Sequence, residues 1–226
     1  MIIKEIIKYL FRKVGYELRK IDVRKKIWEV DENFIQLYRI IESDTSVSVN
    51  RCFMIYQYAR QVKDLGGEVA EFGVYKGGTA KLIAEIFKEE NKIIYLFDTF
   101  SGMPETDKDI DLHQQGDFAD VSLKEVKNYL KNYNNLEFCE GYFPEITLGL
   151  KDKKFCFVYI DVDIYKSIKD GLEFFYNRMV KGGVIVIDDY EGKNCPGVKK
   201  AIDIFIEGKY IYPIITTEAQ CILIKK

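Results

Sequence analysis

Five short apolar runs, three of them ending in an acidic residue and two containing one just before their end, constrain the fold more than any other feature of this sequence. The runs are VAEFG from Val69, IIYLFD from Ile93, LEFCEG from Leu136, FCFVYID from Phe155 and GGVIVID from Gly182. Helical patterns separate them, beginning near Gly78, Ser122, Lys166 and Gly197. This alternation predicts βαβ units and therefore an α/β fold, a doubly wound, mostly parallel Rossmann-like sheet with helices on both faces.

The C-terminal region has a different pattern. YIYPIIT from Tyr210 and AQCILIK from Ala219 predict two strands joined by a short turn around Thr217 and Glu218. Two strands with so short a connection pair antiparallel. The sheet is therefore expected to have seven strands and to end in an antiparallel hairpin.

The N-terminal region precedes this alternation. Residues 1–20 place apolar and basic side chains at helical spacing, and a polar region follows to about Asn50. A helix is then expected over Arg51 to Leu65, ending at Gly66 and Gly67. A chain of 226 residues suits one main core. We therefore expect an N-terminal helical extension over residues 1–50 and one domain over residues 51–226.

The amphipathic pattern of residues 1–20 allows two interpretations. Its basic residues favour weak contact with an anionic membrane surface. The alternative is a helix that packs on its own domain or on a second copy in a homo-oligomer.

Composition excludes several classes. A net charge of -2 gives no general reason to bind nucleic acid. The five cysteines are odd in number, lack CxxC spacing and predict free thiols in a reducing compartment. No apolar stretch reaches about 18 residues, and no signal-peptide pattern is present. These features predict a cytoplasmic protein.

A glycine-rich loop, EFGVYKGGT, follows the first predicted strand. Its glycines, Gly73, Gly77 and Gly78, let a ligand approach the backbone, although such glycines also serve packing turns. A dinucleotide fingerprint needs a glycine where Val74 and Tyr75 stand, so a pyrophosphate fits poorly. A cofactor without a pyrophosphate fits better, and Glu71 suits an amino group.

Asp98 ends the second predicted strand, 20 residues after Gly78. An acid at this position can accept hydrogen bonds from both hydroxyls of a ribose. We therefore expect this site to bind a ligand that contains adenosine but no phosphates. S-adenosylmethionine has that composition, together with a sulfonium and an amino acid tail.

Two pairs of aspartates end the fourth and fifth runs: Asp161 with Asp163, and Asp188 with Asp189. Carboxylates this close repel one another unless a cation neutralises them, and oxygen ligands favour Mg²⁺ or Ca²⁺. No His or Cys partner in the sequence pattern suggests zinc. The alternative is that single aspartates cap the next helices. A divalent ion beside a sulfonium donor predicts methyl transfer to a hydroxyl, with Asp163 as general base.

Several segments resemble the macrocin O-methyltransferase (TylF-type) family of Mg²⁺-dependent, S-adenosylmethionine-dependent O-methyltransferases. They are EFGVYKGGTAKLIAEIF, LFDTFSGMPE, EGYFPEI, FVYIDVDIYKSIKDGLEFFYNRMVKGGVIVIDDYEG and CPGVKKAIDIF, between about Arg51 and Phe205. The resemblance implies a class I methyltransferase fold. It also implies methyl transfer to a hydroxyl of a sugar or related natural-product or glycan acceptor.

The resemblance further implies roles for individual residues. The metal ligands would be Asp161, Asp188 and Asp189, and the catalytic residues Asp163, Asp161 and His113. The cofactor-binding residues would be Glu71, Gly73, Tyr75, Gly77, Gly78, Thr79, Asp98, Thr99, Phe100, Ser101, Asp117, Phe118, Gly141, Tyr142 and Asp161. Residues 107–122 would form the adenine side and a substrate lid, and Arg51 would lie near the cofactor tail.

Other functions remain open from the residues alone. A nicotinamide-dependent oxidoreductase needs the glycine fingerprint that is missing here, and a Mg²⁺ phosphohydrolase usually has its nucleophilic aspartate after the first strand. A module that binds the cofactor without turnover would not need the four aspartates. An N-methyltransferase needs no metal to lower a hydroxyl pKa, so metal dependence separates it from an O-methyltransferase.

Overall fold

The computed structural model describes residues 2–16 and 26–226. These residues divide into two compact units, residues 1–32 and residues 33–226. The larger unit contains the whole sheet. The boundary near residue 50 stays a prediction. The helix Glu32–Arg39 (α2) lies before this boundary, and its Phe34 packs against Phe53 with 4.9 Å between ring centroids.

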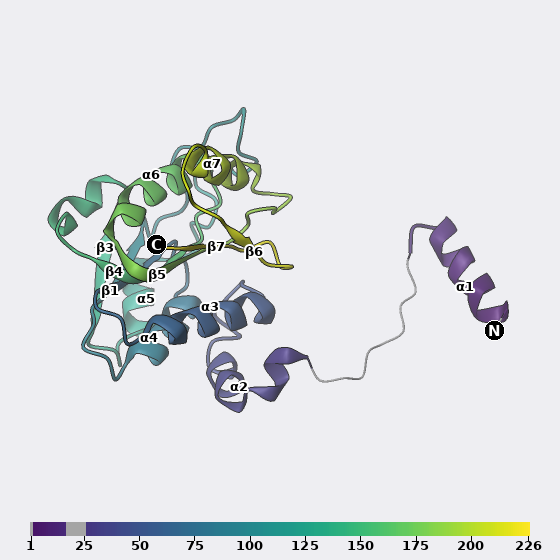
Figure 1. Cartoon of the computed structure of the whole chain (residues 1–226), viewed down its shortest axis with the longest axis horizontal. Coiled ribbons are helices and arrows are strands. Elements are labelled where there is room, and N and C mark those ends of the chain that lie inside the picture. The colour runs from purple at the N-terminus through teal and green to yellow at the C-terminus, as the bar shows by residue number, and fades with distance from the viewer. Residues whose placement is uncertain (1, 17–25) are drawn as a thin grey trace. The chain divides into compact units, whose positions relative to one another are not determined.

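A seven-stranded sheet, counted over the described residues, confirms the predicted fold class (Figure 1). Its strands lie in the order β3-β2-β1-β4-β5-β7-β6. The parallel strands are β1 (Glu68–Phe72), β2 (Ile94–Asp98), β3 (Leu136–Glu140), β4 (Phe155–Ile160) and β5 (Met179–Ile187). The order reverses at β1 and β4, where doubly wound sheets bind ligands beyond the carboxyl ends of the strands.

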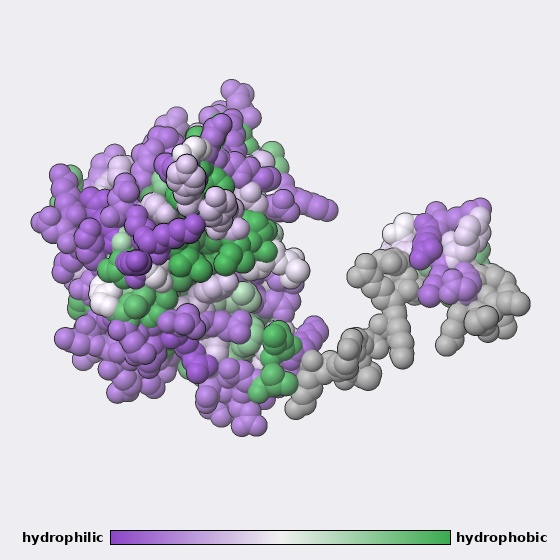
Figure 2. All heavy atoms as spheres, viewed as in Figure 1, coloured by the Kyte–Doolittle hydropathy of each residue, from purple (hydrophilic) through white to green (hydrophobic). Residues whose placement is uncertain are grey.

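The predicted C-terminal hairpin is also present. β7 (Cys221–Ile224) pairs antiparallel with β5 and with β6 (Ile214–Ile215). β6 is shorter than the predicted run from Tyr210, because Pro213 has no N–H to donate to a sheet. Figure 2 shows apolar side chains at the surface around β6 and β7, where Ile214, Ile215 and Ile224 are exposed.

Helices cover both faces of the sheet, as the alternation predicted (Figure 1). One face has α6 (Tyr165–Phe175) and α7 (Pro196–Ile206), and the other has α3 (Val49–Val62), α4 (Gly78–Phe87) and α5 (Leu123–Tyr129). Short 3-10 helices lie at Ile27–Val30, Glu145–Leu150 and Tyr176–Arg178. Every residue of β4 is buried. The central strand therefore gives the site a rigid support.

The smaller unit contains α1 (Ile2–Lys13), which confirms a helical N-terminal extension. Leu10 and Phe11 are exposed on this helix, and Val14 is exposed just after it. The predicted membrane segment, residues 1–20, includes residues 17–20, which lie outside the described residues. Over the residues that the structure describes, every helix is too short or too polar to cross a membrane.

The sequence did not predict α2, which lies in the region assigned as polar up to Asn50. Its sequence, ENFIQLYR, places Phe34, Ile35, Leu37 and Tyr38 at helical spacing, a signal that the assignment to a polar region overlooked, and among the described residues of the helix only Phe34 is buried. The helix predicted over Arg51 to Leu65 runs instead from Val49 to Val62, because the side chain of Ser48 caps it and accepts from the Arg51 N–H.

Candidate functional site

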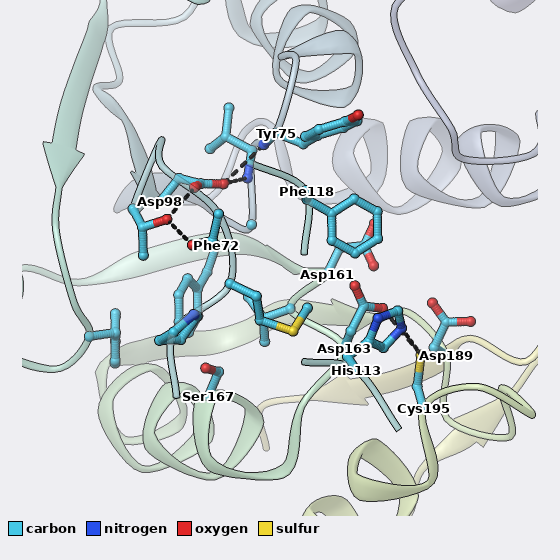
Figure 3. Close-up of a pocket in the computed structure, with 18 of the residues that line it drawn as sticks. Phe72, Tyr75, Asp98, His113, Phe118, Asp161, Asp163, Ser167, Asp189 and Cys195 are labelled. Carbon is cyan, nitrogen blue, oxygen red and sulfur yellow. Dashed lines mark hydrogen bonds between the residues drawn. The ribbon is translucent and has the colours of Figure 1, made fainter. Parts of the chain in front are cut away.

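A cavity of about 1220 Å³ opens at the carboxyl ends of the parallel strands (Figure 3). Its lining includes Gly73 after β1, Asp98 at the end of β2, Asp161 after β4 and Asp189 after β5. These residues all belong to the unit formed by residues 33–226. The acidic strand ends of the sequence therefore meet around one space.

Gly73 brings the β1 and β4 ends into contact. Its φ is +93°, and a Cβ added there would lie 1.9 Å from the carbonyl oxygen of Asp161. A Cβ at Gly78 would lie 2.5 Å from the carbonyl oxygen of Asp44. The sequence predicted that these glycines admit a ligand. In the structure, Gly73 and Gly78 each allow the backbone of another segment to pack closely against the loop.

Asp98 holds the glycine-rich loop in place. Its Oδ2 accepts hydrogen bonds from the backbone N–H groups of Val74 (2.7 Å) and Tyr75 (2.9 Å), and its Oδ1 accepts from Phe100 N–H (2.8 Å). Figure 3 shows the first two bonds. Carboxylate oxygens have further lone pairs, so Asp98 can fix the loop and still accept from a ligand in the cavity.

Glu71 is fully buried beneath the same loop. Its Oε1 accepts a hydrogen bond from the Thr79 hydroxyl, while its Oε2 has no hydrogen-bond partner among the described residues. Burial raises the pKa of Glu71 to about 8, against the opposing effect of the Thr79 hydrogen bond. A buried acceptor without a partner is costly, so this atom is suited to a donor group from a ligand.

Three carboxylates gather on the other side of the cavity. Asp161, Asp163 and Asp189 each offer an oxygen, and these atoms all lie within 4.8 Å of one another. Burial, reinforced by the neighbouring aspartates, raises the pKa of Asp161 well above its usual value, and burial also raises that of Asp163. Mutual repulsion of this kind is relieved by a cation.

Asp188 has its own set of partners, although the sequence predicted it as a ligand beside Asp161 and Asp189. Its Oδ1 accepts from Gln220 Nε2 (2.6 Å), and its Oδ2 accepts from the hydroxyl of Tyr159 (2.8 Å). The difference arises after the strand, since β5 ends at Ile187 and Asp189 has a left-handed φ of +58°, so the chain turns between Asp188 and Asp189 and directs their side chains to different partners. The structure groups Asp163 with Asp161 and Asp189, and the role of Asp188 as a metal ligand stays a prediction.

Arg51 lies against the aspartates at the β5 end. Its guanidinium donates to Asp189 Oδ1 (3.0 Å), to Asp188 Oδ2 (3.5 Å) and to the Glu218 carbonyl oxygen (2.9 Å). The resemblance suggested a place near the cofactor tail. In the structure this cation offsets part of the negative charge, while burial raises the pKa of Asp188 to about 6.

His113 and Cys195 lie beside Asp163, contrary to the expectation that no His or Cys accompanies the aspartates. The Cys195 thiol donates to Asp163 Oδ1 (3.3 Å), and His113 Nε2 lies 3.7 Å from Cys195 Sγ (Figure 3). The other ring nitrogen of His113 is 3.1 Å from Asp117 Oδ2. One feature of the sequence could have indicated Cys195: it stands outside the apolar runs that hold three of the other cysteines.

A family model described as Macrocin-O-methyltransferase (TylF) matches residues 48–226. The chain belongs to this family. The predicted resemblance is thereby confirmed. The family match includes the glycine-rich loop, both aspartate pairs, His113 and Cys195, and it begins just before α3.

Curated relatives of this TylF-family chain are named as O-methyltransferases. Demethyldecarbamoylnovobiocin O-methyltransferase of Streptomyces niveus is 27% identical over 175 residues, which are 70% of this chain and 66% of the relative. Mycinamicin III 3''-O-methyltransferase of Micromonospora griseorubida is 28% identical over 140 residues, 55% of each chain. The chain thus spans between about half and two thirds of the length of these relatives.

Solved structures share the fold of this TylF-family chain. The O-methyltransferase NovP superposes with a TM-score of 0.70 at 24% identity, covering 81% of this chain and 82% of NovP. The calicheamicin methyltransferase CalS11 has a TM-score of 0.68 at 19% identity, covering 93% and 99% of the two chains. These similarities confirm the expected class I methyltransferase architecture.

Most of the family residues predicted on the cofactor side line the cavity. They are Gly73, Tyr75, Gly78, Thr79, Asp98, Thr99, Phe118, Gly141, Tyr142 and Asp161. The others, Glu71, Gly77, Phe100, Ser101 and Asp117, are neighbours of lining residues in the chain or in space. The ring of Phe118 packs against both Tyr75 (5.4 Å between centroids) and His113 (5.6 Å).

The sequence missed several parts of the lining. Among them are the segment 44–47 before α3 and the start of α6 with Lys166, Ser167 and Lys169. Neither stretch has a pattern that indicates a ligand, since the first is a short segment outside any helix and the second has the residues of an ordinary surface helix. The side of the cavity formed by α6 is therefore visible only in three dimensions.

Proposed function

We propose that this chain transfers a methyl group from S-adenosylmethionine to a hydroxyl of a sugar or related natural-product or glycan acceptor. The observation behind the proposal is that the glycine-rich loop and the three carboxylates face one cavity. Membership of the TylF family and the names of the two O-methyltransferase relatives support it. The cavity volume of about 1220 Å³ exceeds the usual range for one small ligand, so cofactor and acceptor can occupy it together.

The cofactor would lie on the β1 and β2 side. Glu71 Oε2, which lacks a partner among the described residues, would accept from the amino group of the methionine tail. That contact would favour the ionised form of Glu71 and lower its raised pKa. Asp98 would accept from the ribose hydroxyls while it holds the Val74 and Tyr75 N–H groups.

A divalent cation, Mg²⁺ in our proposal, would lie on the β4 and β5 side. The donors fit it, because three carboxylate oxygens within 4.8 Å are hard ligands whose mutual repulsion a cation relieves. When bound, such an ion supplies Lewis-acid assistance to deprotonation of an acceptor hydroxyl. Asp161 and Asp189 would hold it, and Asp188 would keep Tyr159 and Arg51 in position around them.

Asp163 would accept the proton of the acceptor hydroxyl. Its raised pKa makes it a stronger base than an exposed aspartate, as a general base near neutral pH requires. The hydroxyl oxygen would then attack the methyl carbon of the sulfonium, and S-adenosylhomocysteine would leave. His113 contacts Cys195, which in turn contacts Asp163, so His113 would help to position the base.

The proposed partners and location of the chain depend on its exposed apolar residues and on its cysteines. Exposed Ile214, Ile215 and Ile224 around β6 are consistent with a homo-oligomer, whose interface this apolar patch would form. Free thiols at all five cysteines are consistent with the cytoplasm. Contact of residues 1–20 with an anionic inner membrane surface would place the enzyme near lipid-linked or polysaccharide acceptors.

Calorimetric titration of the full chain with S-adenosylmethionine, with NAD as the control, tests the cofactor. We expect binding of S-adenosylmethionine alone, both with Mg²⁺ and with EDTA. Transfer of a labelled methyl group to glycosylated natural products and nucleotide-linked sugars, again with Mg²⁺ or EDTA, tests the reaction. The proposal fails if NAD binds instead, or if EDTA leaves the transfer rate unchanged.

A further inference from the structure

A second group of donor atoms lies next to the three carboxylates. His113, Asp163 and Cys195 each offer one ligand atom, and these three atoms lie within 4.8 Å of one another. All three residues line the cavity, so an ion from solvent can reach them. The three side chains come from residues 107–122, from the turn after β4 and from the residue before α7.

The spacing of these atoms matches a tetrahedral zinc site. With Zn–S near 2.3 Å and Zn–N or Zn–O near 2.1 Å, neighbouring ligands of a tetrahedron lie about 3.5 Å apart. Cys195 Sγ is 3.3 Å from Asp163 Oδ1 and 3.7 Å from His113 Nε2. The side chains therefore need little movement to bind one ion.

The orientation of the His113 ring supports the same conclusion. Its Nδ1 is 3.1 Å from Asp117 Oδ2, which leaves Nε2 on the side of Cys195. Histidines that bind zinc typically donate their other ring N–H to a carboxylate, which fixes the ring and its tautomer. Asp117 is itself fixed by the Gln114 N–H at 3.0 Å.

We propose that His113, Asp163 and Cys195 form a second metal site, one that takes Zn²⁺. Imidazole and thiolate ligands favour Zn²⁺ over Mg²⁺, and three protein ligands leave a fourth position for water. When Zn²⁺ binds, the proton that Cys195 Sγ now shares with Asp163 leaves for solvent. The ion ties together three segments of the cavity wall.

The two groups of donors share Asp163. An ion held by His113, Asp163 and Cys195 occupies the carboxylate to which the proposed function assigns proton acceptance. Zn²⁺ binding is consequently inhibitory if that proposed function holds. The metal site itself does not depend on methyl transfer, so the two can be tested separately.

Titration of the full chain with Co²⁺ in place of Zn²⁺ tests the site without an activity assay. A cysteine ligand gives Co²⁺ an intense sulfur-to-cobalt charge-transfer band in the near ultraviolet, which carboxylates alone do not give. We expect this band to reach saturation at one equivalent and to disappear when Zn²⁺ is added. We expect Cys195→Ser to lack the band, and Asp117→Asn to need roughly 10 to 100 times more Co²⁺.

Two control variants separate the site from its surroundings. Cys139→Ser removes a half-buried thiol on β3, and Asp189→Asn removes a carboxylate of the neighbouring group; both should keep the band. Thermal unfolding checks that each variant is folded. Absence of the band in the unaltered chain, or its survival in folded Cys195→Ser, overturns the proposal.

Discussion

The two sides of the cavity satisfy their polar groups in different ways. On the β1 and β2 side, the carboxylate of Asp98 accepts three backbone N–H groups, so the loop is organised by the chain itself. On the β4 and β5 side, Asp161, Asp163 and Asp189 lie close together, and Arg51 offsets only part of their charge. On the β1 and β2 side, Glu71 Oε2 still lacks a partner among the described residues, whereas on the β4 and β5 side three carboxylates stay crowded together; in the proposed function a single donor group completes the first side and a cation completes the second.

Gly73→Ala should have the largest effect, because it damages both sides at once. A Cβ at this position would overlap the Asp161 carbonyl oxygen, and φ of +93° disfavours any side chain. We expect the free energy of unfolding to fall by about 3 kcal/mol or more. Urea unfolding measures it. Gly149→Ala is the control, since nothing lies within 4 Å of its Cβ; a similar loss there would contradict this explanation.

Asp161→Asn should separate the two sides. Methyl transfer should fall by about 100-fold or more, because the variant weakens the cation site. S-adenosylmethionine affinity should stay nearly unchanged, and the rise in melting temperature on adding Mg²⁺ should disappear. Calorimetry and thermal unfolding measure both. Asp152→Asn, at an exposed position before β4, is the matched control. Lost cofactor binding in Asp161→Asn would refute the division between the two sides.

Glu71→Gln should affect only the β1 side. The affinity for S-adenosylmethionine should fall about tenfold, because a charged acceptor is lost. Stability should also change its pH dependence. The pKa of Glu71 is 4.5 in the unfolded chain, and burial raises this pKa to about 8 in the folded chain. The folded state thus binds more protons between these values, and the wild type loses stability as pH rises through this window.

Melting temperatures at pH 5 and pH 8 test the sign. Between pH 5 and pH 8, the melting temperature of the wild type should fall more than that of Glu71→Gln. Glu89→Gln, at an exposed position after α4, should behave like the wild type. An equal loss in wild type and Glu71→Gln would mean that Glu71 does not retain its proton in the folded state.

Removal of residues 1–20 should have the smallest effect on the site. All cavity residues lie in the unit formed by residues 33–226, so cofactor and Mg²⁺ affinities should be unchanged. Only sedimentation with anionic vesicles should decrease, because exposed Leu10 and Phe11 lie on a helix that also has Arg12 and Lys13. If the full chain and the truncated chain both stay in the supernatant, the membrane contact is wrong.

The fold could be predicted from the sequence because it depends on patterns that repeat along the chain. Strands β1 to β5 and the helices between them follow from the alternation of apolar runs and helical spacing. α2 was missed although Phe34, Ile35, Leu37 and Tyr38 have helical spacing, because the pattern covers only eight residues. Its place depends on the contact of Phe34 with Phe53 and Tyr56 of another helix. β6 was predicted too long because Pro213 limits pairing.

The candidate site could be predicted only in part. The strand ends gave Glu71, Asp98 and Asp161, since the carboxyl ends of parallel strands meet at one edge. The division between Asp163 and Asp188 was not visible, because β4 ends at Ile160 and Asp163 has a left-handed φ of +59°, which no strand pattern reveals. Cys195 could not be predicted as a site residue because its partners, His113 and Asp163, are distant in sequence.

The contact at Gly73 has a consequence for the spacing of the two substrates. The loop beside the proposed cofactor and the turn that holds the carboxylates touch through backbone atoms, with no side chain between them. Side chains can change rotamer, whereas two backbone segments in van der Waals contact cannot approach further. In the proposed reaction, the separation between methyl donor and acceptor oxygen is therefore a fixed dimension of the main chain, and it is the acceptor that must adapt to this dimension.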